Sequence, residues 1–156
     1  MSERKIYLAY GSNLNLKQMS QQCPTAKVIG TTELKDYTLM FKGGFGNARA
    51  TIAPCKDKSV PVLLWNITTE DERRLDIYEG YPKYYAKKTV KVKLGRKTVD
   101  AIVYVMNDGF DFNPPSVHYY ETIRNGYLDN NLKVSRLEEA YFYTAEEMRK
   151  KNGRKD

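Results

Sequence analysis

Histidine, cysteine and tryptophan are scarce in this chain of 156 residues, which contains one His, two Cys and one Trp. Cys23 and Cys55 form no Cys-x-x-Cys pair, and His118 has no second histidine with which to form a relay or a metal site. This set provides neither a zinc site nor a disulfide framework. We interpret the cysteines as small buried or loop residues rather than nucleophiles, and His118 as an exposed helix residue.

Long apolar runs are also missing, because no stretch of 18 or more residues is apolar. The first residues, Met-Ser-Glu-Arg-Lys, lack the apolar core and the small-residue cleavage site of a secretory signal. These absences predict a cytoplasmic protein without a membrane partner. A chain of this length buries about 70% of its unfolded surface and folds without staples. We expect a single domain over residues 1–145 and a basic, flexible tail over residues 146–156.

Acidic residues are in the minority, since 26 Lys and Arg against 19 Asp and Glu give a formal net charge of +7. Much of the excess lies in residues 83–97 and 149–155, which are typical of solvated surfaces. No nucleic-acid-binding motif accompanies this charge, and the tyrosines follow strand patterns instead of forming one stacking platform. We therefore expect no nucleic-acid partner, and steeply salt-dependent binding would be the sign of one.

Apolar runs and alternating patterns predict that strands dominate the chain. The predicted strands are residues 6–10, 38–41, 48–53, 60–67, 89–94 and 98–106. The last two flank a hairpin loop in which Gly95 takes a positive φ.

Three helices are predicted from their start and stop signals. The first covers residues 15–22 and is stopped by Pro24. The second covers residues 69–79, with Thr69 and Glu72 as a capping box and a stop at Gly80, and the third begins after Ser116 and ends near residue 125. Because strands outnumber helices without regular alternation, the predicted fold class is α+β: a small, mostly antiparallel mixed β-barrel or curled sheet with flanking helices.

The segment Tyr-Leu-Ala-Tyr-Gly-Ser-Asn-Leu, residues 7–14, leads an apolar strand directly into a short loop. Gly11 is expected to take a positive φ and to let a ligand approach the backbone. The amides of Gly11, Ser12, Asn13 and Leu14 are expected at the positive end of the next helix, where a carboxylate binds well. On these residues alone, a plain strand-to-helix turn with Ser or Asn as N-cap is the simpler interpretation.

Glu79 is the carboxylate at the end of the second predicted helix. Helical spacing places it on the side of Leu75 and Tyr78, whereas Glu70, Arg73, Arg74 and Asp76 are free to face water. The helix dipole at this end and partial burial both raise the pKa of such a carboxyl, which favours the uptake and return of a proton. The helix pattern by itself does not distinguish this inward-facing Glu79 from a surface Glu near a helix end.

Taken in order, five motifs resemble those of the gamma-glutamylcyclotransferase superfamily, which includes gamma-glutamylcyclotransferases and gamma-glutamylamine cyclotransferases. The motifs are Ala9-Tyr10-Gly11-Ser12-Asn13-Leu14, Ala50-Thr51-Ile52, Leu75-Asp76 with Glu79-Gly80, Tyr104-Val105-Met106, and Pro114-Pro115-Ser116 with Tyr119, Ile123 and Gly126. They occur in the family's order and span roughly residues 5–132. The chain is therefore identified as a member of this superfamily.

The resemblance implies the same barrel-like architecture and a cofactor-independent acyltransferase that uses no metal. Its expected reaction releases 5-oxoproline and a free amine from a small gamma-glutamyl substrate, whose own α-amine attacks its γ-carbonyl, so that no enzyme nucleophile is needed. Glu79 is the expected general acid and base, and the amides of Gly11–Leu14 are expected to hold the α-carboxylate. Tyr10 is an expected pocket residue, and the hydroxyl of Tyr104 is expected to help order the substrate.

Several alternatives stay open at this point. A non-catalytic relative that binds a small carboxylate is one, although Glu79 would repel such a ligand. The leaving amine is undetermined, because the pocket walls can be placed only loosely at residues 41–49 and 81–85, with Gly43-Gly44-Phe45-Gly46 as a mobile loop at the edge. Glutathione is not favoured, because the dedicated glutathione-cleaving branch has a different loop sequence. The oligomeric state is also open, a homodimer included.

Overall fold

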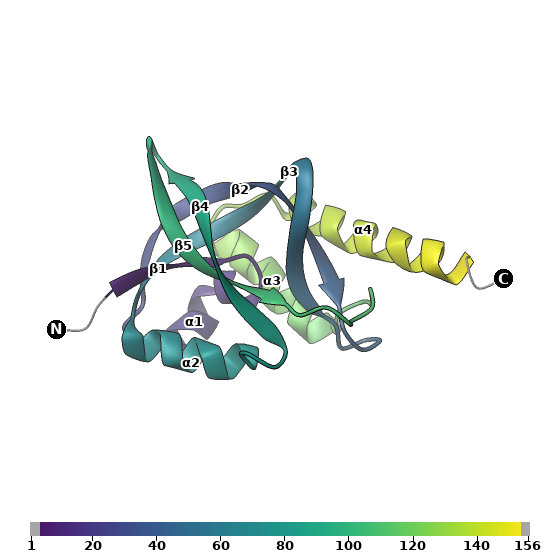
Figure 1. The fold of residues 1–156 in the computed structure, drawn as a ribbon, viewed down its shortest axis with the longest axis horizontal. Helices are drawn as coiled ribbons and strands as arrows, with labels where there is room; N and C mark the ends of the chain where they lie inside the picture. Colours follow the sequence, from purple (N-terminus) through teal and green to yellow (C-terminus); the bar gives the residue numbers. More distant parts are fainter. Residues whose placement is uncertain (1–3, 154–156) are drawn as a thin grey trace.

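A curled sheet with helices beside it makes up the fold in a computed structural model that describes residues 4–153 (Figure 1). In chain order the elements are β1 (Arg4–Ala9), the 3-10 turn η1 (Ser12–Leu14), α1 (Leu16–Gln22), β2 (Lys27–Lys42), β3 (Arg49–Thr68), α2 (Thr69–Glu79), β4 (Tyr85–Leu94), β5 (Lys97–Met106), α3 (Val117–Asp129) and α4 (Val134–Gly153). This arrangement confirms the α+β class.

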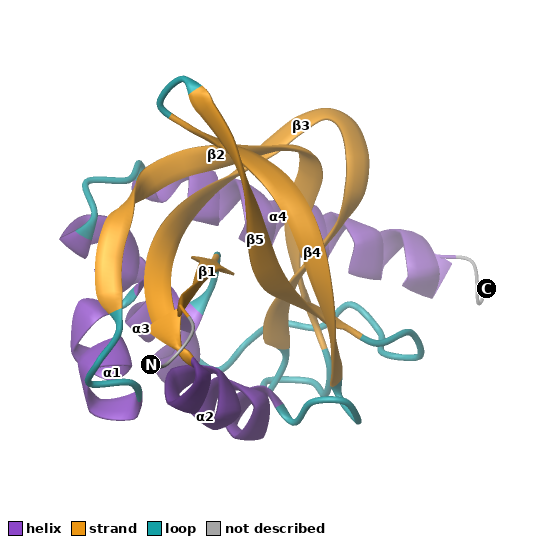
Figure 2. Ribbon diagram, turned by 60° about the vertical axis from the view of Figure 1, so that its left-hand side comes forward, coloured by secondary structure: helices purple, strands orange, loops and turns teal. Residues whose placement is uncertain are grey.

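The strands of the described residues form one five-stranded sheet in the order β2-β3-β1-β5-β4. Neighbours are antiparallel except β1 and β5, which run parallel. The curl brings the two edge strands close to each other. A Cβ placed on Gly30 of β2 would lie 3.8 Å from Leu94 Cδ1 of β4. In the described part of the chain, however, no ladder joins β2 to β4, and the sheet is open and barrel-like instead of the closed barrel that was expected (Figure 2).

β2 and β3 are much longer than the predicted strands. β3 joins the two predicted runs 48–53 and 60–67, and β2 begins eleven residues before the predicted start at Thr38. The intervening segments carry many charged residues and are interrupted at Asp36 and Asp57, which have φ values of 65° and 68°. The Asp57 N–H donates to Asp36 Oδ1 (3.0 Å), so that these irregular positions hold each other in place.

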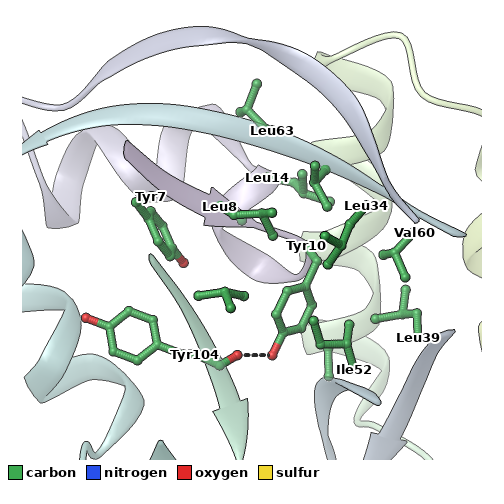
Figure 3. Close-up of a cluster of buried hydrophobic side chains, with 14 of the residues drawn as sticks. Tyr7, Leu8, Tyr10, Leu14, Leu34, Leu39, Ile52, Val60, Leu63 and Tyr104 are labelled. Atoms are coloured by element: carbon green, nitrogen blue, oxygen red, sulfur yellow. Dashed lines mark hydrogen bonds between the residues drawn. The ribbon is translucent and has the colours of Figure 1, made fainter. Parts of the chain in front are cut away.

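The core lies inside the curl of the sheet (Figure 3). Its side chains come from all five strands, from the turn after β1 and from the helices, and they include Leu8, Leu14, Leu34, Leu39, Ile52, Val60 and Leu63. All of these are nearly inaccessible to solvent. Burial on this scale supplies the main driving force for folding and fixes the end of β1, from which the loop at residues 11–14 emerges.

The helix α2 has the predicted bounds, but its capping box lies one residue earlier than predicted. The Thr68 hydroxyl accepts the N–H of Asp71 (3.1 Å), and the Asp71 carboxylate accepts the N–H of Thr68 (3.0 Å). Glu72, the predicted partner, instead pairs with Lys5 and Lys87. At the other end Gly80 takes a φ of 67° and stops the helix, as predicted.

The helix α4 corrects the predicted boundary at residue 145, because it continues without a break to Gly153. Leu137, Ala140 and Thr144 are buried at helical spacing and pack this helix onto the domain. Residues 146–153 therefore belong to a helix rather than to a separate tail, and residues 154–156 lie outside the described part. No helix among residues 4–153 is both long and apolar enough to cross a membrane.

Candidate active site

A cavity of about 520 Å³ lies where the loop after β1 meets the end of α2 and the strands β4 and β5. Six of the residues expected from the sequence line it: Tyr10, Gly11, Ser12, Asn13, Glu79 and Tyr104. The loop of Gly43 and Gly44 also contributes to its wall, as predicted. The structure thus gathers into one cavity two motifs that are almost 70 residues apart in the sequence.

Leu14 is the exception among the expected residues. Its side chain is fully buried in the core and does not line the cavity. Its N–H donates to the carbonyl of Gly11 (3.0 Å) and closes the turn η1. The expectation that the Leu14 amide holds a ligand therefore does not fit the structure.

The loop is a 3-10 turn in front of α1 and not the first turn of that helix. Asn15 is the N-cap of α1, and its side chain accepts the N–H of Gln18 (3.0 Å). The N–H groups of Gly11, Ser12 and Asn13 take part in none of the hydrogen bonds found among the loops and turns of the described residues. These three amides are the donors that the loop can offer to an anion.

Gly11 has a different reason for being glycine than the predicted one. Its φ is −123°, so no left-handed conformation is required. A Cβ at this position would instead lie 3.2 Å from Ala50 Cβ and 3.6 Å from the Tyr119 hydroxyl. The loop is therefore pressed against β3 and α3, and a larger side chain would push it away.

Asn13, whose side chain is buried, fixes the loop from the other side through a set of hydrogen bonds. Its Nδ2 donates to the Tyr7 hydroxyl (2.9 Å), and its Oδ1 accepts from Gln18 (3.1 Å) and Gln22 (3.3 Å). The indole of Trp65 donates to the Asn13 carbonyl (3.1 Å). Because the side chain and the backbone carbonyl of Asn13 are both held by hydrogen bonds, the loop keeps its shape without a ligand.

Glu79 enters the cavity from the last turn of α2, directly before the helix stop at Gly80. Within the described residues its carboxylate forms no hydrogen bond and no ion pair. Burial raises the pKa of Glu79 to about 7, and the positive charge of Arg49 partly opposes this rise. The predicted direction of the pKa change and its cause, burial, are confirmed.

Several tyrosines line the same cavity as Glu79. Burial and then the negative charge of Glu79 raise the pKa of Tyr7 and Tyr10, and burial is also the main cause of the raised pKa of Tyr85 and Tyr119. All four phenols therefore stay protonated. Two are already used as donors, because Tyr10 donates to the Tyr104 carbonyl (2.6 Å, Figure 3) and Tyr85 to the Ala50 carbonyl (2.7 Å).

Tyr104 lines the cavity with its ring, while its hydroxyl donates to Asp76 Oδ1 (2.6 Å). Asp76 also pairs with Lys87 (2.8 Å). The expectation that Asp76 faces water is therefore wrong, because the residue anchors Tyr104 from α2. Ordering of a substrate by the Tyr104 hydroxyl stays a prediction, and it would require this hydroxyl to share its bond with Asp76.

Tyr84 and Tyr85 line the wall and lie within the range 81–85 that was expected there, whereas sequence reasoning missed Tyr78. The position of Tyr78 follows a pattern that core packing also produces, and Tyr119 was marked only by its place within a motif. Cys23 is buried and His118 exposed, as expected. In the part of the chain that the structure describes, no three His, Cys, Asp or Glu side chains gather closely enough to hold a metal ion.

The sequence model of a protein family described as gamma-glutamyl cyclotransferase, AIG2-like, matches residues 7–128. This range contains every residue of the cavity wall. The chain belongs to this family. The first residue of the match lies in β1 and the last in α3, so that the match covers the sheet except the first three residues of β1, while α4 lies beyond it.

Individual relatives agree with this assignment. A human gamma-glutamylcyclotransferase is 28% identical over 141 residues, which cover 85% of this chain and 74% of the relative. A solved structure of a gamma-glutamyl cyclotransferase has a TM-score of 0.80 at 26% identity and covers 88% of this chain and 86% of its own. YkqA from Bacillus subtilis has a TM-score of 0.77 at 20% identity, with 92% of this chain and 55% of that chain covered, and shares the fold.

Proposed function

We propose that this protein is a cofactor-independent gamma-glutamyl cyclotransferase that releases 5-oxoproline and a free amine from a small gamma-glutamyl amine or amide. The observation that carries the assignment is the carboxyl of Glu79, which stands unpaired in the cavity with a pKa raised to about 7. A group with this pKa is present in both protonation states near neutral pH, as a general acid and base must be. Membership of the family supports the reaction class.

The reaction needs only proton transfers and a bent substrate. Glu79 takes a proton from the α-ammonium group, and the free amine attacks the γ-carbonyl carbon of the same molecule, forming the C–N bond of a five-membered ring. The protonated Glu79 then gives its proton to the leaving nitrogen as the original amide bond breaks. The attacking nitrogen loses a second proton, which Glu79 passes to the released amine, so that the products are a lactam N–H and an ammonium group. Glu79 ends in its starting state, and neither a nucleophile nor an oxidant is consumed.

The loop supports this chemistry by holding the substrate at its α-carboxylate. Gly11, Ser12 and Asn13 line the same cavity as Glu79, and their N–H groups are the available donors. Holding one end of the glutamyl chain brings its amine and its γ-carbonyl together, and such preorganisation removes much of the entropic barrier of ring closure. Because Glu79 must be ionised to begin, we expect the activity to rise with pH through about 7.

Replacing Glu79 with Gln tests this function. The substitution keeps the size of the side chain and removes its proton transfer, so we expect the rate of 5-oxoproline release to fall on the order of 100- to 10,000-fold. The rate is measured by mass spectrometry on a panel of gamma-glutamyl compounds. Glu70→Gln is the matched control, because Glu70 lies on the same helix and, among residues 4–153, pairs only with the exposed Arg73 and Arg74. Wild-type rates in the Glu79→Gln variant would contradict the role of Glu79 as general acid and base.

The alternative is a non-catalytic relative that binds a small carboxylate in the same cavity. The donors of the loop support it, whereas Glu79 opposes it, because an ionised carboxylate repels an anionic ligand. The same panel separates the two functions: a binder forms no 5-oxoproline from any compound but is stabilised against heat by carboxylate ligands.

A further inference from the structure

Arg49, the first residue of β3, is a cation without an anionic partner at the site. It lines the cavity, is accessible to solvent, and forms no ion pair with a carboxylate of the described residues. Its side chain is nevertheless held in place. Nη1 donates to the Tyr78 hydroxyl (3.4 Å), and the guanidinium carbon lies 4.7 Å from the centre of the Tyr119 ring and 5.9 Å from that of Tyr78. Such stacking orients the planar guanidinium group.

Both tyrosines that hold Arg49 also touch the loop. The Tyr78 hydroxyl is hydrogen-bonded to Ser12 Oγ (2.9 Å). The Tyr119 hydroxyl accepts the N–H of Ala50 (3.0 Å) and lies 3.6 Å from the position that a Cβ of Gly11 would occupy. The guanidinium group is thus linked through one tyrosine on each side to the loop that carries the three available amides.

We propose that Arg49 binds the α-carboxylate of the glutamyl group together with the N–H groups of Gly11, Ser12 and Asn13. A guanidinium fork and backbone amides are complementary to the two oxygens of a carboxylate. Arg49 would then make the site selective for ligands with a free α-carboxylate. This assignment rests on the proposed function, because the glutamyl group is the ligand that it concerns.

The position of Arg49 also suits the reaction. Its positive charge favours the ionised form of Glu79, and a carboxylate bound to Arg49 would compensate that charge. Glu79 would then hold a proton more tightly once a substrate is bound, at the moment when it must accept one from the ammonium group. The other cation of the wall, Lys42, lies over the ring of Phe112 (4.7 Å) and is not linked to the loop.

Binding of 5-oxoproline tests the assignment directly, because this molecule retains the carboxylate and has no leaving amine. Isothermal titration calorimetry is performed with the wild type, Arg49→Met and Arg73→Met, the last of which removes an equal charge from an exposed position of α2. We expect Arg49→Met to weaken binding about 10- to 100-fold, as for a lost hydrogen bond to a charged group, and Arg73→Met to bind as the wild type does. Equal affinity of Arg49→Met and the wild type, or no binding by the wild type, overturns the assignment.

Arg49→Lys and 2-pyrrolidinone provide further controls. Lysine keeps the charge and loses the fork, so we expect an intermediate affinity for 5-oxoproline. 2-Pyrrolidinone lacks the carboxylate, and its weak binding should be the same in the wild type and in the Arg49 variants. If Arg49→Met does not fold, as judged by circular dichroism, Arg49→Lys with these two ligands still decides the question, since equal loss for both ligands would contradict a role in binding the carboxylate.

Two substrates separate the α-carboxylate from a carboxylate on the leaving amine. In gamma-glutamylalanine the leaving amine carries a carboxylate, and in gamma-glutamylmethylamide it does not. We expect Arg49→Met to lower kcat/KM by the same factor for both. A loss confined to gamma-glutamylalanine would mean that Arg49 binds the leaving amine instead. A wild type that binds 5-oxoproline through Arg49 but converts no gamma-glutamyl compound would contradict the proposed function and leave the carboxylate site in place.

Discussion

Glu79 combines three conditions that seldom meet in one carboxylate: it ends a helix, lies in a cavity wall, and has no partner within the described residues. The surrounding phenols are protonated and offer it no compensating charge, and Arg49 acts only at a distance. The ionised form is therefore destabilised relative to water. The same burial that tunes the residue for proton transfer should lower the stability of the folded protein.

This cost should depend on pH in a defined direction. Burial raises the pKa of Glu79 from the ordinary 4.5 to about 7 in the folded protein. Below pH 4.5 the residue is protonated in the folded and unfolded states alike, and no stability is lost. Between pH 4.5 and 7 the unfolded chain releases the proton and the folded protein keeps it, so the free energy of unfolding falls, by about 3 kcal/mol at most once pH 7 is passed.

Thermal melts of the wild type and Glu79→Gln should therefore diverge as the pH rises. We expect equal melting temperatures near pH 4, and a Glu79→Gln variant that is more stable than the wild type at pH 8, because a neutral amide avoids the cost of a buried charge. Glu70→Gln is the control and should follow the wild type at both pH values. If the difference in melting temperature between Glu79→Gln and the wild type is the same at pH 8 as at pH 4, the carboxylate of Glu79 is well solvated.

Individual residues differed in how far the sequence could predict them. Glu79 was predictable because helical spacing and the stop at Gly80 fixed both its side of the helix and its distance from the end. Leu14 was not, because a 3-10 turn uses its amide and α1 begins only after the N-cap Asn15, and sequence does not separate this turn from the first turn of a helix. The role of Arg49 could not be predicted from the sequence, since its tyrosine neighbours come from α2 and α3.

The helix α3 holds the loop in place by an unusually close approach. At Gly126 a Cβ would lie 2.7 Å from the N atom of Asn15 and 2.7 Å from atoms of Leu14. Asn130 adds a hydrogen bond from its side chain to the Leu14 carbonyl (2.8 Å). Glycine is thus required here for space rather than for a special φ, and the turn η1 rests directly on the surface of α3.

Gly126→Ala should separate these two elements. The added methyl group meets backbone atoms that cannot rotate away, so we expect a loss of stability of about 1–3 kcal/mol in spite of the higher helix propensity of Ala. Gly153→Ala is the matched control, because it makes the same change at the end of α4, where nothing lies within 4 Å. Chemical denaturation of both variants measures the difference, and a Gly126→Ala variant as stable as Gly153→Ala would contradict the close contact.

Helix ends were easier to predict than the extent of strands. The bounds of α2 and the cap of α3 at Ser116 agree with the sequence, since caps and stops are local features. The capping box shifted by one residue because Glu72 is drawn to Lys5 and Lys87, which come from β1 and β4. The first half of β2 was missed, since its pairing with β3 compensates for a segment with many charges and little apolar periodicity.

In the molecule as a whole, β1 lies in the centre of the sheet and delivers the loop to the cavity. It pairs with β3 on one side and with β5 on the other, although both follow much later in the chain. Through family resemblance, the motifs in the sequence indicated which residues meet. The parallel pairing of β1 with β5 and the open edge between β2 and β4 were not predictable, because they depend on long-range contacts that periodicity does not encode. The helix α4 was not predicted at all, although its buried residues Leu137, Ala140 and Thr144 lie at helical spacing.

The contact of α4 with β2 gives the last prediction. The hydroxyl of Thr144 accepts the N–H of Phe41 (3.0 Å), and both residues are buried although 103 positions separate them. Thr144→Val keeps the shape and leaves this N–H without a partner in the core, which should cost about 1–3 kcal/mol and lower the melting temperature by about 2–4 °C for each kcal/mol. Thr144→Ser retains the hydroxyl and should lose much less. If the serine and valine variants melt together, the hydrogen bond does not hold α4 on the domain, and packing by Leu137 and Ala140 must do so alone.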